Sequence, residues 1–176
     1  TVNSEVLTIS GGLGTTSSAN VAAYNLVNTS QGTLTLANGP SGANQGLASN
    51  YTLTGGTQDY TITERVLNSS GSKTYDANTD ALAGAITLSN LVSGEALNHS
   101  GTATISSANA GSYTITNLSG ISIADGSGGT ASNYTLTGGT HNFTINQRPL
   151  AATIARQYDG TKTAAGSDLS SFDALQ

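Results

Sequence analysis

The stretch SNYTLTGGT at Ser49–Thr57 recurs without a single change at Ser132–Thr140, which sets a fixed offset between two copies (49 to 132). The same offset relates four further pairs: Tyr60-Thr61-Ile62 and Phe143-Thr144-Ile145, Arg65 and Arg148, Leu67 and Leu150, Tyr75-Asp76 and Tyr158-Asp159. Self-similarity at a fixed period indicates a repeat architecture. A second repeated motif, Ser17-Ser18-Ala19-Asn20, recurs as Ser106-Ser107-Ala108-Asn109 at a slightly larger offset (17 to 106). The two copies therefore differ in length within a loop.

The repeat divides the chain into one complete unit and two partial ones. Residues 65–147 contain every recurring sequence motif (box) and are predicted to form a complete β repeat. Residues 1–64 lack the Tyr-Asp opening, which predicts an N-terminally truncated β repeat, and residues 148–176 correspond to the opening of a third. We therefore expect additional copies on both sides in a longer protein.

Within each unit, apolar and polar residues alternate as they do in half-buried strands. Tyr134 and Leu136, followed by Phe143 and Ile145, would face one side. The glycines at 138–139 predict a hairpin between these two strands, and those at 55–56 predict another. Further strands are expected at 102–105, 113–117 and 121–123, and one short helical turn at 76–82. This pattern predicts an all-β chain of tandem small β-sandwich (Ig-like) repeats in an elongated array, with β-grasp-like repeats as the alternative.

Composition excludes several functional classes. Charged residues make up only 9% of the chain, and the net charge of -5 disfavours nucleic acid and anionic lipid as partners. Because the chain has no Cys, disulfides and thiolate-bound metals are impossible. No apolar run approaches the length of a membrane span, so we expect no membrane insertion.

Catalytic candidates are few. His141 aligns with Gln58 in the other copy, so its imidazole is dispensable, and His99 has no neighbouring Ser, Asp or Glu at a spacing typical of a triad. We expect both histidines to be solvated loop residues. The sequence therefore predicts no catalytic residue, no cofactor, no metal site and no enzymatic activity.

The recurring aromatic and acidic residues are predicted to be structural. An Asp beside Gly or Ala commonly caps a turn, and Tyr supplies much of the buried area of a thin core. Tyr113, after Ala110-Gly111, resembles a tyrosine corner, and Tyr60 and Phe143 are expected in the cores. The predicted structural repeat motif comprises Tyr51, Tyr75, Asp76, Tyr113, Tyr134, Tyr158 and Asp159.

These boxes resemble a known family. Lys73-Thr74-Tyr75-Asp76, Arg156-Gln157-Tyr158-Asp159-Gly160-Thr161, the Arg148-Pro149-Leu150 junction and the Asn-Tyr-Thr-Leu boxes are similar to YDG/MBG-type tandem repeats of large bacterial adhesins. In two places the chain departs from that pattern, because Ala77 and Val66 stand where Gly and Pro are typical. The resemblance implies a filamentous-haemagglutinin-like surface protein, exported by two-partner secretion and involved in cell aggregation and biofilm formation.

The expected function is that of a stalk. Low-charge repeats at the bacterial cell surface, anchored to the outer membrane or secreted, would hold a distal binding region away from the cell. Their partners would be neighbouring repeats of the same chain. The alternative is a binding module, in which the repeats themselves bind exopolysaccharide, other cell-surface glycans or a glycosylated host or matrix ligand.

Overall fold

The computed structural model describes residues 2–26, 31–163, 165–166 and 169–172. Its contacts divide the chain into two compact units, one of residues 1–67, 90–98 and 123–139 and the other of residues 68–89, 99–122 and 140–176. In the described residues, the helical elements are three single 3-10 turns, η1 (Ala48–Asn50), η2 (Ala83–Ala85) and η3 (Ala131–Asn133). The fold is therefore all-β, as the sequence predicted.

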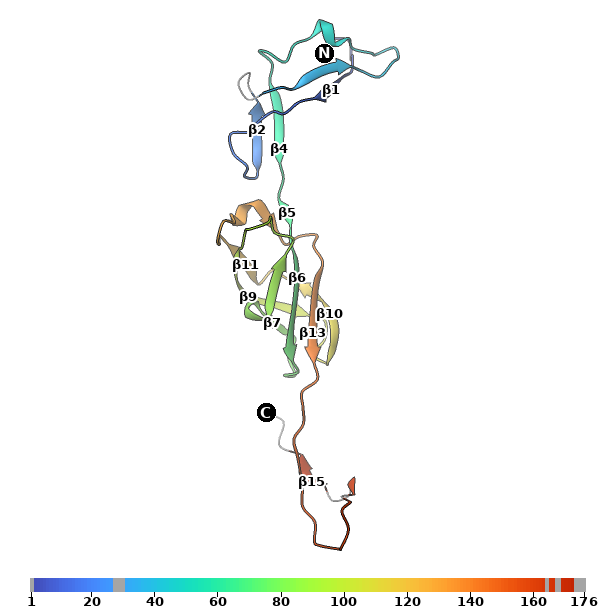
Figure 1. The fold of residues 1–176 in the computed structure, drawn as a ribbon, viewed down its shortest axis with the longest axis vertical. Coiled ribbons are helices and arrows are strands. Elements are labelled where there is room, and N and C mark those ends of the chain that lie inside the picture. The colour runs from blue at the N-terminus through green and yellow to red at the C-terminus, as the bar shows by residue number, and fades with distance from the viewer. Residues whose placement is uncertain (1, 27–30, 164, 167–168, 173–176) are drawn as a thin grey trace. The chain divides into compact units, whose positions relative to one another are not determined.

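Most of the second unit is built around one seven-stranded sheet that is nearly closed and barrel-like (Figure 1). The strand order is β11-β9-β10-β13-β6-β8, and β7 also pairs with β9. The strands are β6 (Asn68–Thr74), β7 (Asp80–Leu82), β8 (Ile86–Ser89), β9 (Asn98–Ile105), β10 (Gly111–Asn117), β11 (Ile121–Ala124) and β13 (His141–Asn146). A separate pair, β14 (Ala152–Ile154) with β15 (Leu169–Phe172), follows.

Strand β10 joins the two halves of this sheet. Its residues 111–114 pair with β13, and its residues Ile115 and Asn117 pair with β9, with a register shift between these two residues. The expected sandwich of two separate sheets was thus wrong, because β10 is hydrogen-bonded to strands of both halves. The central pair β6–β13 is parallel, a pairing that β-grasp sheets share, although no helix crosses the sheet in the described residues.

The core of the second unit comes from alternate strand positions. Along β13 the burial alternates, so that His141, Phe143 and Ile145 lie inside while Asn142 and Asn146 face solvent. Phe143 is 1% exposed, and burial of a ring of this size stabilises a fold by about 2–3 kcal/mol. The other buried apolar residues are Ala81, Ala83, Ile86, Ala103, Ile105, Ile115 and Ile121.

The first unit contains smaller sheets. Strand β1 (Leu7–Gly11) pairs with β3 (Thr35–Asn38), β2 (Ala22–Leu26) with β4 (Gln58–Ile62), and β5 (Arg65–Val66) runs parallel to β12 (Tyr134–Thr135). Among the residues of this unit that the structure describes, the buried large apolar side chains are Leu67 and Tyr134.

The sequence correctly predicted strands at 102–105, 113–117 and 121–123, but both hairpins were wrong. Strand β12 pairs with β5, and β13 pairs with β10 and β6. The threonine hydroxyls explain the difference. Thr52 and Thr135 each accept a hydrogen bond from the backbone N–H two residues later, at 3.1 Å, and this local turn directs the chain away from a hairpin. The helical turn expected at 76–82 lies instead at η2.

The two copies have the same local backbone geometry. Strand β2 pairs with β4 in the register in which β10 pairs with β13: Tyr24 lies opposite Tyr60 as Tyr113 lies opposite Phe143. Turns η1 and η3 occupy equivalent positions, and the residues that follow them, Tyr51 and Tyr134, share a φ of -132°. The identical sequence boxes therefore adopt the same conformation.

Candidate functional site

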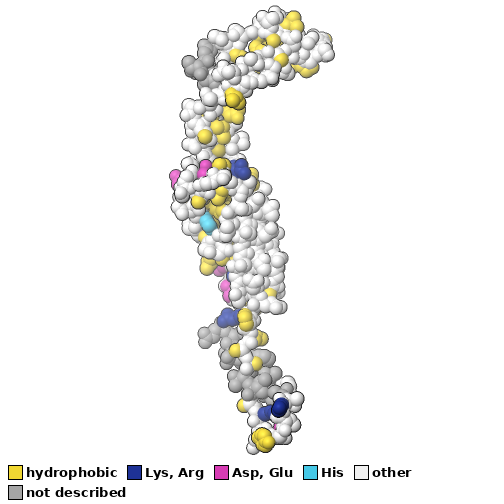
Figure 2. Space-filling view, in the orientation of Figure 1, with side chains coloured by type: hydrophobic (Ala, Val, Ile, Leu, Met, Phe, Trp, Pro, Cys, Tyr) yellow, Lys and Arg dark blue, Asp and Glu magenta, His cyan; other side chains and the backbone are white. Residues whose placement is uncertain are grey.

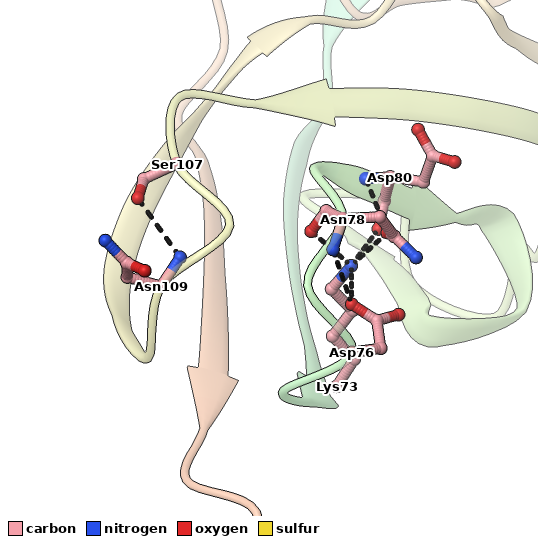
Figure 3. Close-up of polar contacts among 6 residues, drawn as sticks. All are labelled: Lys73, Asp76, Asn78, Asp80, Ser107 and Asn109. Atoms are coloured by element: carbon pink, nitrogen blue, oxygen red, sulfur yellow. Dashed lines mark hydrogen bonds and ion pairs between the residues drawn. The ribbon is translucent and has the colours of Figure 1, made fainter. Parts of the chain in front are cut away.

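A network of polar groups lies where β6 ends (Figure 3). Lys73 Nζ donates to Asn78 Oδ1 at 2.6 Å and to the backbone oxygens of Asn78 and Asp80 at 2.9 and 2.8 Å. It also forms an ion pair of 2.8 Å with Asp76, whose carboxylate accepts a bond from Asn78 N–H. This arrangement, named here the cation knot, holds the 73–80 loop together.

The same knot recurs around Arg156. Arg156 pairs with Asp159 at 2.5 Å and donates to the hydroxyl and the backbone oxygen of Thr161 at 3.0 and 2.6 Å. Asp159 in turn accepts the Thr161 N–H at 2.9 Å. The offset of the repeat places Arg156 at the position of Lys73, and Thr161 at that of Asn78. The chemistry of the knot is therefore kept while its side chains change.

The backbone conformation of the residue after each aspartate explains why the Tyr-Asp-Gly motif contains a glycine. Gly160 has a φ of +77°, and Ala77, at the equivalent position, has a φ of +62°. This left-handed region suits glycine and costs a residue with a Cβ about 1–2 kcal/mol. Ala77 is thus a strained substitute for glycine.

The electrostatics of the knot favour ionised aspartates. The hydrogen bond from Lys73 lowers the pKa of Asp76, and the backbone and hydroxyl bonds from Thr161, followed by the bond from Arg156, lower the pKa of Asp159. A small cavity of about 170 Å³ adjoins the first knot, lined by its four polar residues with Leu82, Ala85 and Phe143. Because Lys73 is bonded to groups of its own loop, the arrangement serves to fix the turn.

A second recurring cluster joins a tyrosine to a tight turn. Tyr134 donates its hydroxyl hydrogen to Glu95 and accepts the Val92 N–H at 3.1 Å. Tyr51 makes the same two bonds with Glu5 and Val2. In both turns the Glu N–H donates to the Val carbonyl at 3.0 Å. We name this arrangement the tyrosine clamp.

The clamps raise the pKa of both phenols. Burial, followed by the hydrogen bond to Glu95, raises the pKa of Tyr134, and the hydrogen bond to Glu5 raises that of Tyr51. Tyr134 is 4% exposed and Tyr51 is half-buried. The acceptor carboxylates therefore hold the tyrosines in their neutral form.

The other motif residues have different environments. Tyr113 is half-buried and its hydroxyl lies 3.5 Å from the Ala110 oxygen, beside the Ser107–Asn109 turn shown in Figure 3. Tyr75 is half-buried, whereas Tyr158 is 94% exposed. Tyr60, expected in a core, is 51% exposed, because β4 pairs only with β2 among the described strands. That expectation was wrong.

Sequence reasoning missed the partners of these residues. Lys73 and Arg156 both stand three residues before the motif aspartate, and Glu5 and Glu95 both close a Val-x-x-Glu turn. The spacing was visible in the sequence. It was overlooked because the basic residue changes type and because the glutamates follow a third offset (5 to 95).

The histidines are not solvated loop residues. His141 lies in β13, 7% exposed, with Nδ1 2.9 Å from Ser69 Oγ. His99 lies in β9, and its Nε2 is within 3.1 Å of the Ala83 and Ile86 carbonyls. Among the described residues, no group of three or more His, Asp or Glu side chains could hold a metal ion, and no helix could cross a membrane.

Comparison with known protein families matches residues 63–142 to the YDG domain. No curated protein and no solved structure matches the chain. The matched residues contain the first cation knot, the Tyr134 clamp and strands β6 to β11 of the seven-stranded sheet. A YDG domain is therefore found at residues 63–142 of this chain.

Proposed function

We propose that this chain is a non-catalytic spacer built from tandem YDG-type units, which projects a distal binding region from the bacterial cell surface. In this proposal the chain is extracellular, belongs to a filamentous-haemagglutinin-like adhesin, and serves adhesion, aggregation or biofilm formation. The partners of each unit are its neighbours in the array.

The recurrence of local geometry outside the YDG domain is the observation that supports this proposal most strongly. Residues 1–64 repeat the strand register, the 3-10 turn and the tyrosine clamp of residues 91–147. Residues 150–163 repeat the cation knot. A polypeptide that repeats such local geometry along its length is suited to setting a length.

A contact within the first unit is also consistent with stacked units. Asn133, from the second Asn-Tyr-Thr-Leu box, accepts the Val21 N–H at 2.8 Å and donates to Asn20 Oδ1 at 2.9 Å. Its counterpart in the first box is Asn50, and the counterpart of Asn20 is Asn109. The residues needed to repeat this contact along an array are therefore present in the other copies.

The surface chemistry suits a spacer. Figure 2 shows a face that is largely uncharged, with few Lys, Arg, Asp or Glu side chains. Uncharged Ser, Thr, Asn and Gly side chains give little basis for electrostatic capture of unrelated molecules. A surface of this kind separates a binding region from the cell without adhering to passing ligands.

Surface labelling of cells that produce the parent protein tests the proposal. Antibodies raised against residues 63–142 should bind intact, unpermeabilised cells. Deletion of one complete unit, equivalent to residues 65–147, should shorten the projection seen by electron microscopy and leave ligand binding by the isolated distal region unchanged. Labelling that requires permeabilised cells would refute the surface role, and direct glycan binding by the purified chain would favour the binding-module alternative.

A further inference from the structure

The chain contains several Asn-x-Ser/Thr triplets in which x is not Pro, and this is the acceptor pattern for sugars linked to asparagine. They begin at Asn28, Asn50, Asn68, Asn98, Asn117, Asn133 and Asn142. A sequence rich in Asn, Ser and Thr produces such triplets by chance, so the pattern alone does not define a site. The state of each asparagine side chain in the structure separates them.

The repeat retains one of these triplets in spite of a change within it. Asn117 and the serine two residues later match Asn28 and its serine, at the same offset (28 to 117) as the second repeated motif (17 to 106). The residue between them is Thr in the first copy and Leu in the second. Asn28 lies outside the described residues, so Asn117 carries the structural argument. The two copies keep the elements that an N-linked acceptor requires.

The side chain of Asn117 is held in a turn with its own serine. Its Oδ1 accepts the Ser119 N–H at 2.8 Å, which is an Asx turn. Both residues are exposed, and Nδ2 of Asn117 has no hydrogen-bond partner among the described residues. A hydrogen bond to the amide oxygen stabilises the negative charge that forms there when Nδ2 loses a proton. The turn therefore prepares Nδ2 as a nucleophile and leaves it accessible.

The other triplets have different environments. Asn133 donates its Nδ2 to Asn20 Oδ1 at 2.9 Å, and Asn98 donates its Nδ2 to the Asp125 backbone oxygen at 2.7 Å. Asn68 is half-buried. Of the triplets that the structure describes, only the one at residues 117–119 has the bond from the Ser or Thr N–H to the asparagine side chain.

Neighbouring backbone bonds fix the turn that presents Asn117, the last residue of β10. The Ile121 N–H donates to the Leu118 oxygen at 2.8 Å, and the Thr102 N–H of β9 donates to the Gly120 oxygen at 3.2 Å. The turn lies so close to β9 that a Cβ at Gly120 would be 2.1 Å from the Thr102 oxygen. An acceptor that is already ordered costs a modifying enzyme little conformational entropy on binding.

We propose that Asn117 is a glycosylation site, at which a transferase of the producing cell links a hexose to Nδ2. The donor is a sugar activated by a diphosphate leaving group. In the reaction Nδ2 attacks the anomeric carbon of the donor, a bond from nitrogen to carbon forms, and the bond from the anomeric carbon to the phosphate oxygen breaks. The proton of Nδ2 passes to a base of the transferase, and the diphosphate leaves with the electron pair.

A sugar at this turn would act on the edge of the seven-stranded sheet. Strand β11 follows the turn directly and is one end of the strand order. An edge strand offers unpaired backbone groups to another chain, and a bulky hydrated group beside it obstructs such pairing. The expected effect of the sugar is therefore to oppose association of chains through β11.

Mass spectrometry of the parent protein tests the proposal. The protein is purified from the cells that produce it, and its proteolytic peptides are sequenced with fragmentation that preserves sugar linkages. The peptide that contains Asn117 should carry a hexose on that residue, while the peptides with Asn98 and Asn133 should carry none. An unmodified Asn117 would overturn the proposal, whether or not the protein lies at the cell surface.

Modification of the purified chain shows whether the turn selects the site. The folded chain is incubated with a purified transferase specific for Asn-x-Ser/Thr and with uridine-diphosphate glucose. We expect glucose on Asn117 at a rate at least about tenfold above that on Asn98 or Asn133, and loss of this preference when the chain is unfolded. Equal rates at the three asparagines of the folded chain would overturn the proposal.

Matched variants separate the acceptor from the fold. Asn117→Gln and Ser119→Ala should abolish modification at this turn, whereas Ser119→Thr, which keeps the acceptor pattern, should retain it. Asn109→Gln changes an exposed asparagine that has no Ser or Thr two residues later, so it should leave modification of Asn117 unchanged. Continued modification of Asn117 in the Ser119→Ala chain would also overturn the proposal.

Discussion

Replacement of Phe143 by Ala tests how the seven-stranded sheet is held together. The ring is 1% exposed and faces Gly71 across the parallel β6–β13 pair. Because glycine has no side chain that could move into the space, the cavity left by the ring should persist. Truncation of a buried Phe costs about 3–5 kcal/mol, and we expect about 4 kcal/mol here. For a domain of this size that corresponds to a fall in Tm of about 15–30 °C.

The repeat supplies a matched control. Tyr60→Ala removes an aromatic ring from the equivalent strand position, but that ring is 51% exposed, so the cost should be under about 1 kcal/mol. Differential scanning calorimetry of the two variants and the unaltered chain measures both effects. Equal shifts for the two variants would contradict the difference in burial between Phe143 and Tyr60.

Three further predictions concern the knot and the clamp. Ala77→Gly should raise the free energy of unfolding in urea by up to about 1 kcal/mol, because glycine adopts the positive φ at residue 77 without strain, although it also increases the entropy of the unfolded chain. A loss of stability would show that the backbone at Ala77 is not strained. Folding lowers the pKa values of Asp76 and Asp159, so both carboxylates should stabilise the fold above about pH 4, and this stabilisation should be lost as the pH falls through their folded pKa values. Asp76→Asn should weaken this pH dependence. A urea midpoint that does not change between about pH 3 and 7 would contradict the prediction. Folding raises the pKa of Tyr134, so this phenol should ionise at a pH above the usual value near 10, and its contribution to stability should be lost as the pH rises through the folded pKa. An ultraviolet titration of Tyr134→Phe should therefore lack the tyrosine ionisation that occurs at the highest pH. Loss of an ionisation at lower pH instead would refute the tyrosine clamp.

Strand existence could be predicted from sequence because alternation is local. The segments at 102–105, 113–117 and 121–123 were found from period-two patterns and flanking turn residues alone. Strand pairing could not be found in this way. The Gly-Gly turns suggested hairpins, whereas the actual partners of β13 are β10 and, in parallel, β6, where Ser69 lies opposite His141. No local pattern encodes a parallel contact between segments so far apart in the chain.

In the candidate site, too, only the locally encoded residues could be predicted from the sequence. Tyr134 and Asp76 were recognised because they recur unchanged, but their partners Glu95 and Lys73 are set by turns and by tertiary contact. Tyr60 shows the limit most plainly. Its alternating position predicted burial, and whether the residue is buried depends on a covering strand that its own sequence cannot supply.

Small-angle X-ray scattering of the chain tests the proposed spacer most directly. End-to-end units about 35–40 Å long should give a radius of gyration clearly above about 20 Å, against about 16 Å for a compact globule of this length. Each additional complete unit should lengthen the maximum dimension by about 35–40 Å. A radius of gyration equal to that of the compact globule, or a maximum dimension that does not grow with added units, would contradict the account.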